Sequence, residues 1–315
     1  MSILQPIAGL AVFVGLAWLV SENRTAVRWR LVAVGVALQL TIGLLFLRLP
    51  VFAHVFVFLN RAVLALEAAT RAGTSFVFGY LGGGGLPFAE SFPGASFVLA
   101  FQALPLVLVI SALSALFFYW RVLPVVVRAF SWGLQKTLGI GGAEGLGLSA
   151  NIFVGMVESP LFIRPYLKQM TRSEIFSLMA CGMATIAGTV MVLYASILGG
   201  RIPGIMGHIL TASIISVPAA VTVAKIMIPE GGEPTYGRLA APEPAVNAMD
   251  AITRGTLQGV QLLINIVAML VVLVALVHLV NTVLGLLPDV GGAPWTLQRF
   301  FGWIMSPVVW LMGVP

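Results

Sequence analysis

Apolar residues are gathered into long runs along this chain, and short polar segments separate the runs. Six runs reach or approach the length of a membrane-spanning helix: residues 3–20, 31–48, 95–119, 175–199, 205–228 and 257–286. A helix that crosses the hydrocarbon core needs about 20 predominantly apolar residues. The pattern therefore predicts an all-α polytopic membrane protein with about six transmembrane helices.

Two other segments depart from this pattern. The stretch 51–73 is shorter in apolar length and carries Arg61, Glu67 and Arg71, which is typical of an interfacial helix lying along the membrane surface. The stretch 229–250 is the most polar part of the chain. It is too short to form a domain, and we predict a solvent-exposed cytoplasmic loop.

Basic residues orient the runs, because short cytoplasmic loops carry an excess of Lys and Arg. Arginines follow the first run, which places the N-terminus outside. With alternating crossings, the segment 144–163 begins on the cytoplasmic side. If it crossed completely, the basic residues Arg164, Lys168 and Arg172 would lie outside, against this rule. We therefore predict that 144–163 enters the membrane and turns back as a re-entrant helical hairpin.

Residues inside this segment fit a hairpin with an unwound tip. Gly155 can end a first helix, Ser159 can cap a second, and Pro160 suits a first turn, where no amide hydrogen is needed. Unwound backbone at membrane depth is tolerated only where protein buries it or it lines a cavity. Glu158 would lie at this tip. The stretch Thr171–Glu174 predicts a capping box that opens the next helix.

Composition agrees with a membrane protein and excludes several other classes. Of 315 residues, 59% are hydrophobic and 9% are charged, and the mean hydropathy is +1.04; soluble domains carry about 25% charged residues. The net charge of +6 lies in short loops beside apolar runs, so it requires no nucleic-acid partner. A single cysteine, Cys181, excludes a disulfide framework and is expected to be buried. No charge precedes Glu22, so the first run is predicted to be a retained span, not a signal peptide.

Three polar residues in apolar surroundings are candidates for a binding site. Glu158 is predicted to be the only acidic residue in the middle of an apolar segment, and it is either a substrate or ion contact or a structural acid. Asn151 is either a ligand or a hydrogen-bonding contact between helices. Thr185 is either a ligand or a hydroxyl that bonds back to its own helix. His278 and Asn281, in the last run, are predicted to be packing or interface groups.

Enzyme signatures are missing from the sequence. It contains no H-E-x-x-H, G-x-S-x-G or G-x-x-x-x-G-K-[ST] motif. No Ser or Cys has a His or Lys plausibly placed as its base, and the histidines form no metal-ligand pattern. We therefore expect no enzyme and no cofactor, and an intramembrane enzyme is the least favoured alternative.

Long stretches resemble one membrane family. "ANIFVGMVESPLFIRPYLKQMTRSEIF", then "MACGMATIAGTVMVLYASIL", "NAMDAITRGTLQGVQLLINIVAML" and "FGWIMSPVVWLMGVP", resemble the concentrative nucleoside transporter family in the same order. The resemblance covers essentially the whole chain. It implies a cation-coupled nucleoside importer of the cell (inner) membrane, usually a homotrimer, in which a transport domain moves against a scaffold. The coupling ion would be sodium or a proton.

The resemblance also implies binding residues. The sodium ligands would be the side chains of Asn151 and Thr185 and the carbonyls of Val154 and Ile186. The substrate contacts would be Gly155, Met156, Val157, Glu158 and Val190.

This chain departs from the family pattern in two places. The hairpin tip has G-M-V-E where the family has G-Q-[ST]-E, so two polar groups that would read a nucleobase are replaced by Met156 and Val157. Unpaired base groups would then cost about 1–3 kcal/mol each. The family also continues beyond "WLMGVP" into a second hairpin and two more spans, which the chain is expected to lack.

We therefore expect four parts. The first is an N-terminal scaffold part with the interfacial helix (1–140), and the second is a transport core with the hairpin and two spans (141–228). The third is a cytoplasmic loop (229–250), and the fourth is a long scaffold span followed by an interfacial helix (251–315). The alternatives to nucleoside uptake are a non-transporting membrane assembly or regulatory subunit that keeps the fold, and a carrier for a different small solute.

Overall fold

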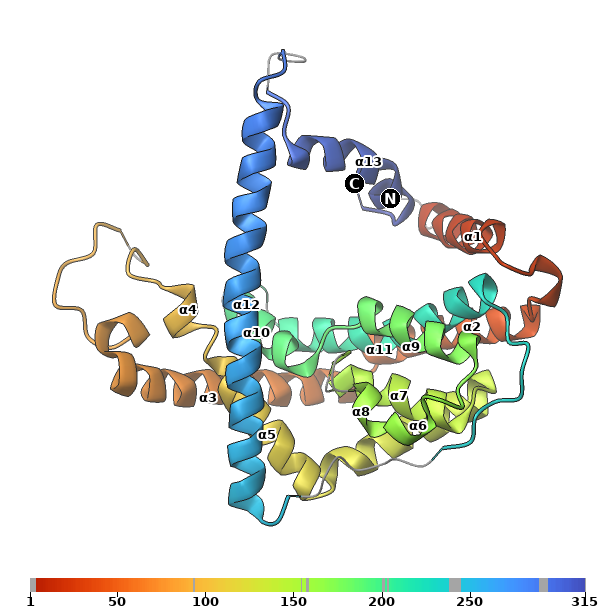
Figure 1. The fold of residues 1–315 in the computed structure, drawn as a ribbon, viewed down its shortest axis with the longest axis horizontal. Helices are drawn as coiled ribbons and strands as arrows, with labels where there is room; N and C mark the ends of the chain where they lie inside the picture. Colours follow the sequence, from red (N-terminus) through yellow and green to blue (C-terminus); the bar gives the residue numbers. More distant parts are fainter. Residues whose placement is uncertain are drawn as a thin grey trace. The chain divides into compact units, whose positions relative to one another are not determined.

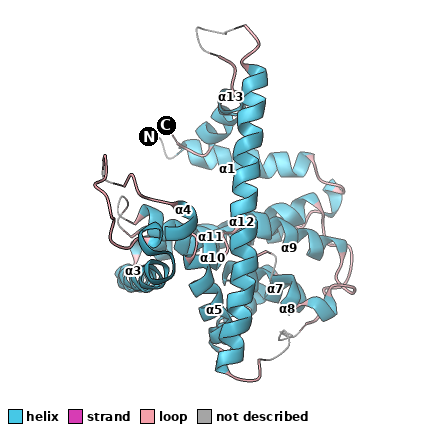
Figure 2. Cartoon of the chain, turned by 60° about the vertical axis from the view of Figure 1, so that its left-hand side comes forward, coloured by secondary structure: helices cyan, strands magenta, loops and turns pink. Residues whose placement is uncertain are grey.

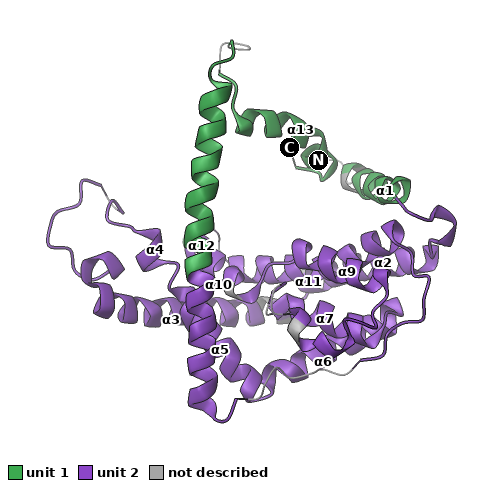
Figure 3. Ribbon diagram, in the orientation of Figure 1, with its two compact units in different colours: residues 1–20, 264–315 green, residues 21–263 purple. Residues whose placement is uncertain are grey.

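The described part of the protein is built of helices joined by turns and loops, with no strand among the described residues (Figures 1 and 2). The computed structural model describes residues 4–92, 94–153, 155, 156, 159–199, 202, 204–237, 245–288 and 294–314. The chain divides into two compact units, one of residues 1–20 with 264–315 and one of residues 21–263 (Figure 3).

The smaller unit contains the two ends of the chain. It consists of α1 (Leu4–Leu19), the later part of α12 (Ala248–Leu284) and α13 (Leu297–Leu311). Asn281 joins α12 to α13, because its amide nitrogen donates to Gln298 Oε1 at 3.0 Å and its oxygen accepts from the Leu297 amide at 2.8 Å. The prediction that Asn281 is a packing group is confirmed.

The larger unit contains the helices that surround the candidate site, together with the start of α12. Its remaining α-helices are α2 (Trp29–Arg48), α3 (Pro50–Phe78), α4 (Leu99–Gln102), α5 (Leu106–Tyr119), α6 (Val122–Leu138), α7 (Gly142–Phe153), α8 (Ser159–Phe162), α9 (Arg172–Ala184), α10 (Gly188–Leu198) and α11 (Ile205–Met227). Helix α11 packs against α2 and α9. A Cβ built on Gly35 of α2 would lie only 2.0 Å from Thr222 Oγ1 of α11, so the α2 backbone approaches α11 closely.

Four stretches of the described residues are long and apolar enough to cross a membrane: Trp29–Phe46, Leu99–Tyr119, Ile205–Met227 and Ala248–Leu284. Each corresponds to a predicted run, although α12 begins nine residues before its run does. The first predicted run forms a shorter helix, and the run 175–199 is divided between α9 and α10. The predicted interfacial segment lies within the 29-residue helix α3.

Helix α6 is the main element that the apolar runs do not predict. It is amphipathic, and its buried face of Pro124, Val127, Ser131, Leu134 and Leu138 packs against α7. Its other positions include basic residues, so the segment has no continuous apolar run. The helix therefore covers one side of the segment in which the candidate site lies.

The described residues of 229–247 form a loop that is mostly exposed or half-buried, in agreement with the prediction, but Thr235 is an exception. Thr235 is buried, and its carbonyl accepts a hydrogen bond from the Ala143 amide at 3.1 Å. Its amide and hydroxyl both donate to Glu174, at 2.8 and 2.7 Å. Thr235 can be buried here because its amide, carbonyl and hydroxyl groups each have a hydrogen-bond partner. Residues 238–244 lie outside the described part.

Candidate functional site

The predicted hairpin segment contains a break between two helices. Helix α7 ends at Phe153 and α8 begins at Ser159, and Gly155 between them has φ = 114°, a region that favours glycine. Ser159 does not act as the predicted cap, since it is the first residue of α8 and its hydroxyl donates to the Gly147 carbonyl of α7 at 2.5 Å. This bond fastens α8 to α7. Of the predicted site residues, Val154, Val157 and Glu158 lie outside the described part.

A second break divides the apolar run 175–199. The predicted capping box is confirmed at the start of α9, where Thr171 and Glu174 bond reciprocally. Helix α9 ends at Ala184, and the backbone is extended at Thr185 (φ −101°, ψ 160°) before α10 begins at Gly188. Among the described residues, no backbone amide donates to the Ile186 carbonyl. That carbonyl is thus available to a ligand, as the resemblance implies.

Glycines bring the two breaks together. A Cβ built on Gly188 would lie 2.2 Å from the Phe153 carbonyl oxygen, so the start of α10 rests on the end of α7. A Cβ built on Gly182 would lie 2.8 Å from Met156 Cβ and 3.5 Å from Asn151 Nδ2. The tip of the hairpin segment and the last turn of α9 are therefore in direct contact.

Asn151 is one of the buried polar side chains that have no hydrogen-bond partner among the described residues, and it lies beside both breaks. Its side chain is 1% exposed, and neither its oxygen nor its nitrogen has a hydrogen-bond partner among the described residues. Its polar neighbour is the buried thiol of Cys181, which is at best a weak partner. A buried polar group without partners costs about 1–3 kcal/mol, and in a native protein it calls for an explanation such as a bound water or ion.

The other described candidates differ in their surroundings. The Thr185 hydroxyl donates to the Cys181 carbonyl at 2.9 Å, which is the back-bonding alternative from the sequence, but its oxygen can still accept or coordinate. Ile186 and Val190 are half-buried. Met156 is 57% exposed and so can contact a solute.

We expect Gly188→Ala to destabilise the protein by roughly 1–3 kcal/mol, because the added methyl group must displace the Phe153 carbonyl. Gly133→Ala is the matched control, since nothing lies within 4 Å of a Cβ built there in the interior of α6. Alanine in a helix interior should be neutral or stabilising. Thermal unfolding of the two variants in detergent checks this; equal melting temperatures would refute the close contact.

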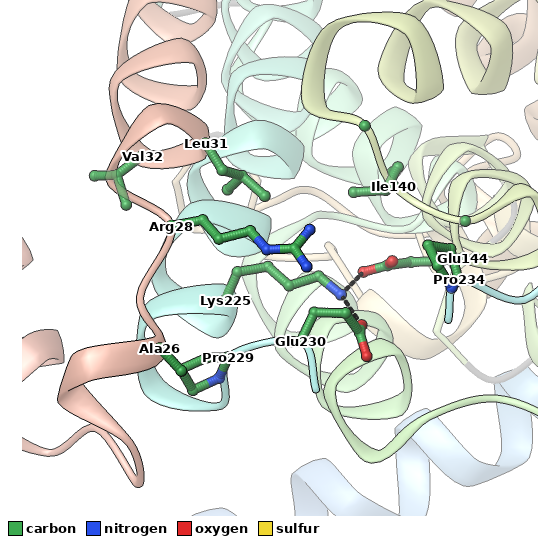
Figure 4. Close-up of a pocket in the computed structure, with 12 residues that line it drawn as sticks. Ala26, Arg28, Leu31, Val32, Ile140, Glu144, Lys225, Pro229, Glu230 and Pro234 are labelled. Carbon is green, nitrogen blue, oxygen red and sulfur yellow. Dashed lines mark hydrogen bonds and ion pairs between the residues drawn. The ribbon is translucent and has the colours of Figure 1, made fainter. Parts of the chain in front are cut away.

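The sequence analysis did not predict a cluster of buried charged residues that lies at the start of α7 and the end of α11. Glu144 is 1% exposed and Lys225 is 7% exposed, so both charged side chains are buried although neither lies in the middle of an apolar segment. Lys225 Nζ lies 3.1 Å from Glu144 Oε1 and 2.8 Å from Glu230 Oε2 (Figure 4). Glu144 and Lys225 each lie near the end of an apolar segment, where the sequence suggests an interfacial position. Only the fold brings the two residues together.

The cluster borders a cavity of about 30 Å³ that Arg28 also lines. Burial alone would raise the pKa of the Glu230 carboxyl, but the Lys225 ammonium and hydrogen bonds from Thr171 and Gly232 hold that pKa below its usual value. Glu230 is therefore ionised at neutral pH and holds Lys225 as its partner.

Comparisons with known proteins cover nearly the whole chain. Residues 8–81 match the family described as Na+ dependent nucleoside transporter N-terminus, residues 208–315 match the corresponding C-terminus family, and residues 100–201 match a family described as Gate, nucleoside recognition. The chain is 34% identical to an uncharacterized transporter, YutK, of Bacillus subtilis, over 100% of this chain and 76% of the relative. It is 32% identical to the nucleoside permease NupC of Helicobacter pylori, over 100% of this chain and 73% of the relative.

A mammalian relative and a solved structure agree with these matches. Sodium/nucleoside cotransporter 2 of Rattus norvegicus is 33% identical over 98% of this chain and 45% of the relative. The structure of CNTnw in an inward-facing substrate-bound state superposes with a TM-score of 0.88 at 32% identity, over 99% of this chain and 74% of that one. The chain belongs to the concentrative nucleoside transporter family.

Proposed function

We propose that this protein takes up nucleosides together with a cation across the cell membrane, and that Asn151 is a ligand of the coupling ion. The observation that carries the ion site is the buried Asn151 amide, whose oxygen and nitrogen have no hydrogen-bond partner among the residues that the structure describes. Membership of the family supports nucleosides as the substrate class and transport, not catalysis, as the activity.

The donors near Asn151 suit a hard monovalent cation. Beside the amide oxygen, the break between α9 and α10 offers the Thr185 oxygen and the Ile186 carbonyl, and the Val154 carbonyl is a further proposed ligand. Hard cations prefer oxygen ligands, and the donors named here are all neutral, which favours sodium over a divalent ion. Unwound backbone that coordinates an ion between half-helices is a recurring arrangement in secondary transporters.

The substrate would bind beside the ion at the tip of the hairpin. Gly155, Met156, Val157 and Glu158 would form the tip, and Val190 on α10 would contact the base. Glu158 would accept hydrogen bonds from the nucleoside, while Met156 offers a flexible apolar surface. This exposed methionine in place of a polar side chain is what favours the second candidate, a carrier for a different small solute.

Further parts of the proposal concern architecture. Residues 141–228 would form the transport core with a re-entrant hairpin, and it would move between outward-open and inward-open positions against a scaffold built from 1–140 and 251–315. Helix α3 would lie along the interface, and the protein would assemble as a homotrimer in the inner membrane. The Ser159–Gly147 bond supports two limbs of one hairpin, because it joins α8 back to α7.

Thr185→Val should weaken activation by sodium without unfolding the protein. Valine keeps the shape of threonine and removes the coordinating oxygen, and the bond to the Cys181 carbonyl that is lost is local to one helix. Sodium titrations of nucleoside binding would measure this against Thr253→Val, whose hydroxyl makes the same kind of bond to the Met249 carbonyl on α12. Unchanged sodium activation in Thr185→Val would point to another ion site or to protons.

Binding experiments on the purified protein test the proposal directly. Uridine and adenosine should raise the melting temperature, and sodium chloride should strengthen their effect where choline chloride does not. A binding partner of the folded state stabilises it according to its concentration and affinity. No response to any nucleoside, with or without sodium, would favour the non-transporting subunit or the different solute.

A further inference from the structure

We propose that the segment 229–237, here named the strap, and the Glu144–Lys225–Glu230 cluster position the two helices that end at the ion site, and so set the affinity for the coupling cation. These residues are positioning residues, which contact neither the proposed cation nor the nucleoside. The inference rests on the proposed function for its cation, but the contacts that carry it are independent of that function.

Lys225 is the centre of the cluster. It lies at the end of α11, and its one ammonium group pairs with Glu144 on α7 and with Glu230 on the strap. Glu144 is buried on α7, and its ion pair with Lys225 is the charged contact that links it to α11. Removing one partner of such a buried pair leaves an uncompensated charge and is strongly destabilising.

Glu174 makes a second attachment of the strap. Its carboxylate accepts from the amide and hydroxyl of Thr235, and it also completes the capping box at the start of α9. The Thr235 carbonyl in turn accepts from the Ala143 amide at the start of α7. Two residues further along the strap, a Cβ built on Gly237 would lie 2.8 Å from Ala143 Cα, so the strap lies directly on α7. The strap thus fastens the starts of α7 and α9 to each other.

The ends of the same two helices carry the proposed ion ligands. Glu144 and Asn151 are seven residues apart on α7, which is two turns and about 10 Å along one face of the helix. Glu174 and Thr185 stand at the two ends of α9. A helix is stiff over this length, so a shift of its fastened start moves its far end. The strap therefore holds the distance between Asn151 and the break at Thr185.

Two variants test this positioning, and circular dichroism first establishes whether each of them folds. Thr235→Val removes the buried hydroxyl but keeps the backbone bonds of the strap, and Lys225→Met removes the centre of the cluster. Combining Lys225→Met with Glu144→Gln removes a buried charge with its partner and should restore part of the loss. Thr253→Val serves as the control, because its hydroxyl donates to the Met249 carbonyl within α12.

In each variant we measure the sodium concentration that gives half-maximal stabilisation, and then uridine affinity at saturating sodium. Mutation of a residue that holds a metal ligand in place typically changes metal affinity by 10–100-fold. We therefore expect the sodium concentration for half-maximal stabilisation to rise roughly 10-fold in Thr235→Val and in Lys225→Met. Uridine affinity at saturating sodium should stay within about twofold of the parent, whereas general loosening would weaken both. Unchanged sodium affinity in folded Thr235→Val overturns the inference.

A second readout does not depend on transport or on sodium. Hydrogen exchange at the amides of residues 145–152 should become faster in Thr235→Val than in Thr253→Val, because α7 loses its fixed start. If the parent shows no sodium response, the proposed ion site fails and this comparison alone decides the positioning. Equal protection of α7 in Thr235→Val and Thr253→Val overturns the inference. This comparison also decides the inference if Lys225→Met does not fold.

Discussion

Replacing Glu158 by glutamine is expected to weaken nucleoside binding by about 10- to 100-fold. At the proposed hairpin tip, a carboxylate would accept hydrogen bonds from a ribose hydroxyl or a base N–H, and hydrogen bonds to charged groups contribute about 1.5–3 kcal/mol. Glutamine keeps the size of the side chain and removes the charge. Isothermal titration of uridine and adenosine into the purified variant measures the loss.

The control for this experiment is Glu90→Gln, which alters an exposed carboxylate in the same unit, outside the strap and the proposed site. It should bind nucleosides like the parent. If Glu158→Gln also binds like the parent, the carboxylate is structural, and the acidic residue in "GMVESP" is explained by a partner on a neighbouring helix.

The second large effect is expected at Asn151, and its sign differs between stability and function. Asn151→Leu should stabilise the cation-free protein by roughly 1–2 kcal/mol, because it replaces a buried amide that has no partner among the described residues by an apolar group of similar size. The same change should abolish the increase in melting temperature that sodium causes. Thermal unfolding with and without sodium measures both effects.

Asn281→Leu provides a contrast with the same chemical change. Asn281 has partners for both its oxygen and its nitrogen, so its replacement should lower stability and leave the sodium effect intact. A loss of stability in Asn151→Leu comparable to that in Asn281→Leu would mean that Asn151 has a protein partner. The ion site would then lie elsewhere.

Local patterns in the sequence predict much of this fold. Long apolar runs locate the main helices, and the T-R-S-E stretch correctly marks the start of α9 with its capping box. Gly155 marks a break because its φ is positive, and Asn281 is correctly predicted to be a packing group. Each of these features depends on residues close together in the chain, or on the hydropathy of one segment.

Features that depend on contacts between distant segments could not be predicted in this way. The break at Thr185–Ala187 interrupts an apolar run that contains no proline and no charged residue, and the start of α10 at Gly188 approaches Phe153 closely there. The burial of Thr235 depends on Glu174, which lies 61 residues earlier. The partial burial of the polar strap and the Lys225 cluster follows from tertiary pairing of polar groups, which a polar sequence alone does not reveal.

Uptake into cells that produce this protein tests the central claim most directly. Labelled uridine and adenosine are offered under an inward sodium gradient, an inward proton gradient, or neither, and Asn151→Leu serves as the matched variant. We expect at least one nucleoside to accumulate above its external concentration when one of the two gradients is imposed, and we expect Asn151→Leu to abolish accumulation driven by sodium. Equal uptake with and without either gradient, or uptake no greater than in cells lacking the protein, would contradict cation-coupled nucleoside transport.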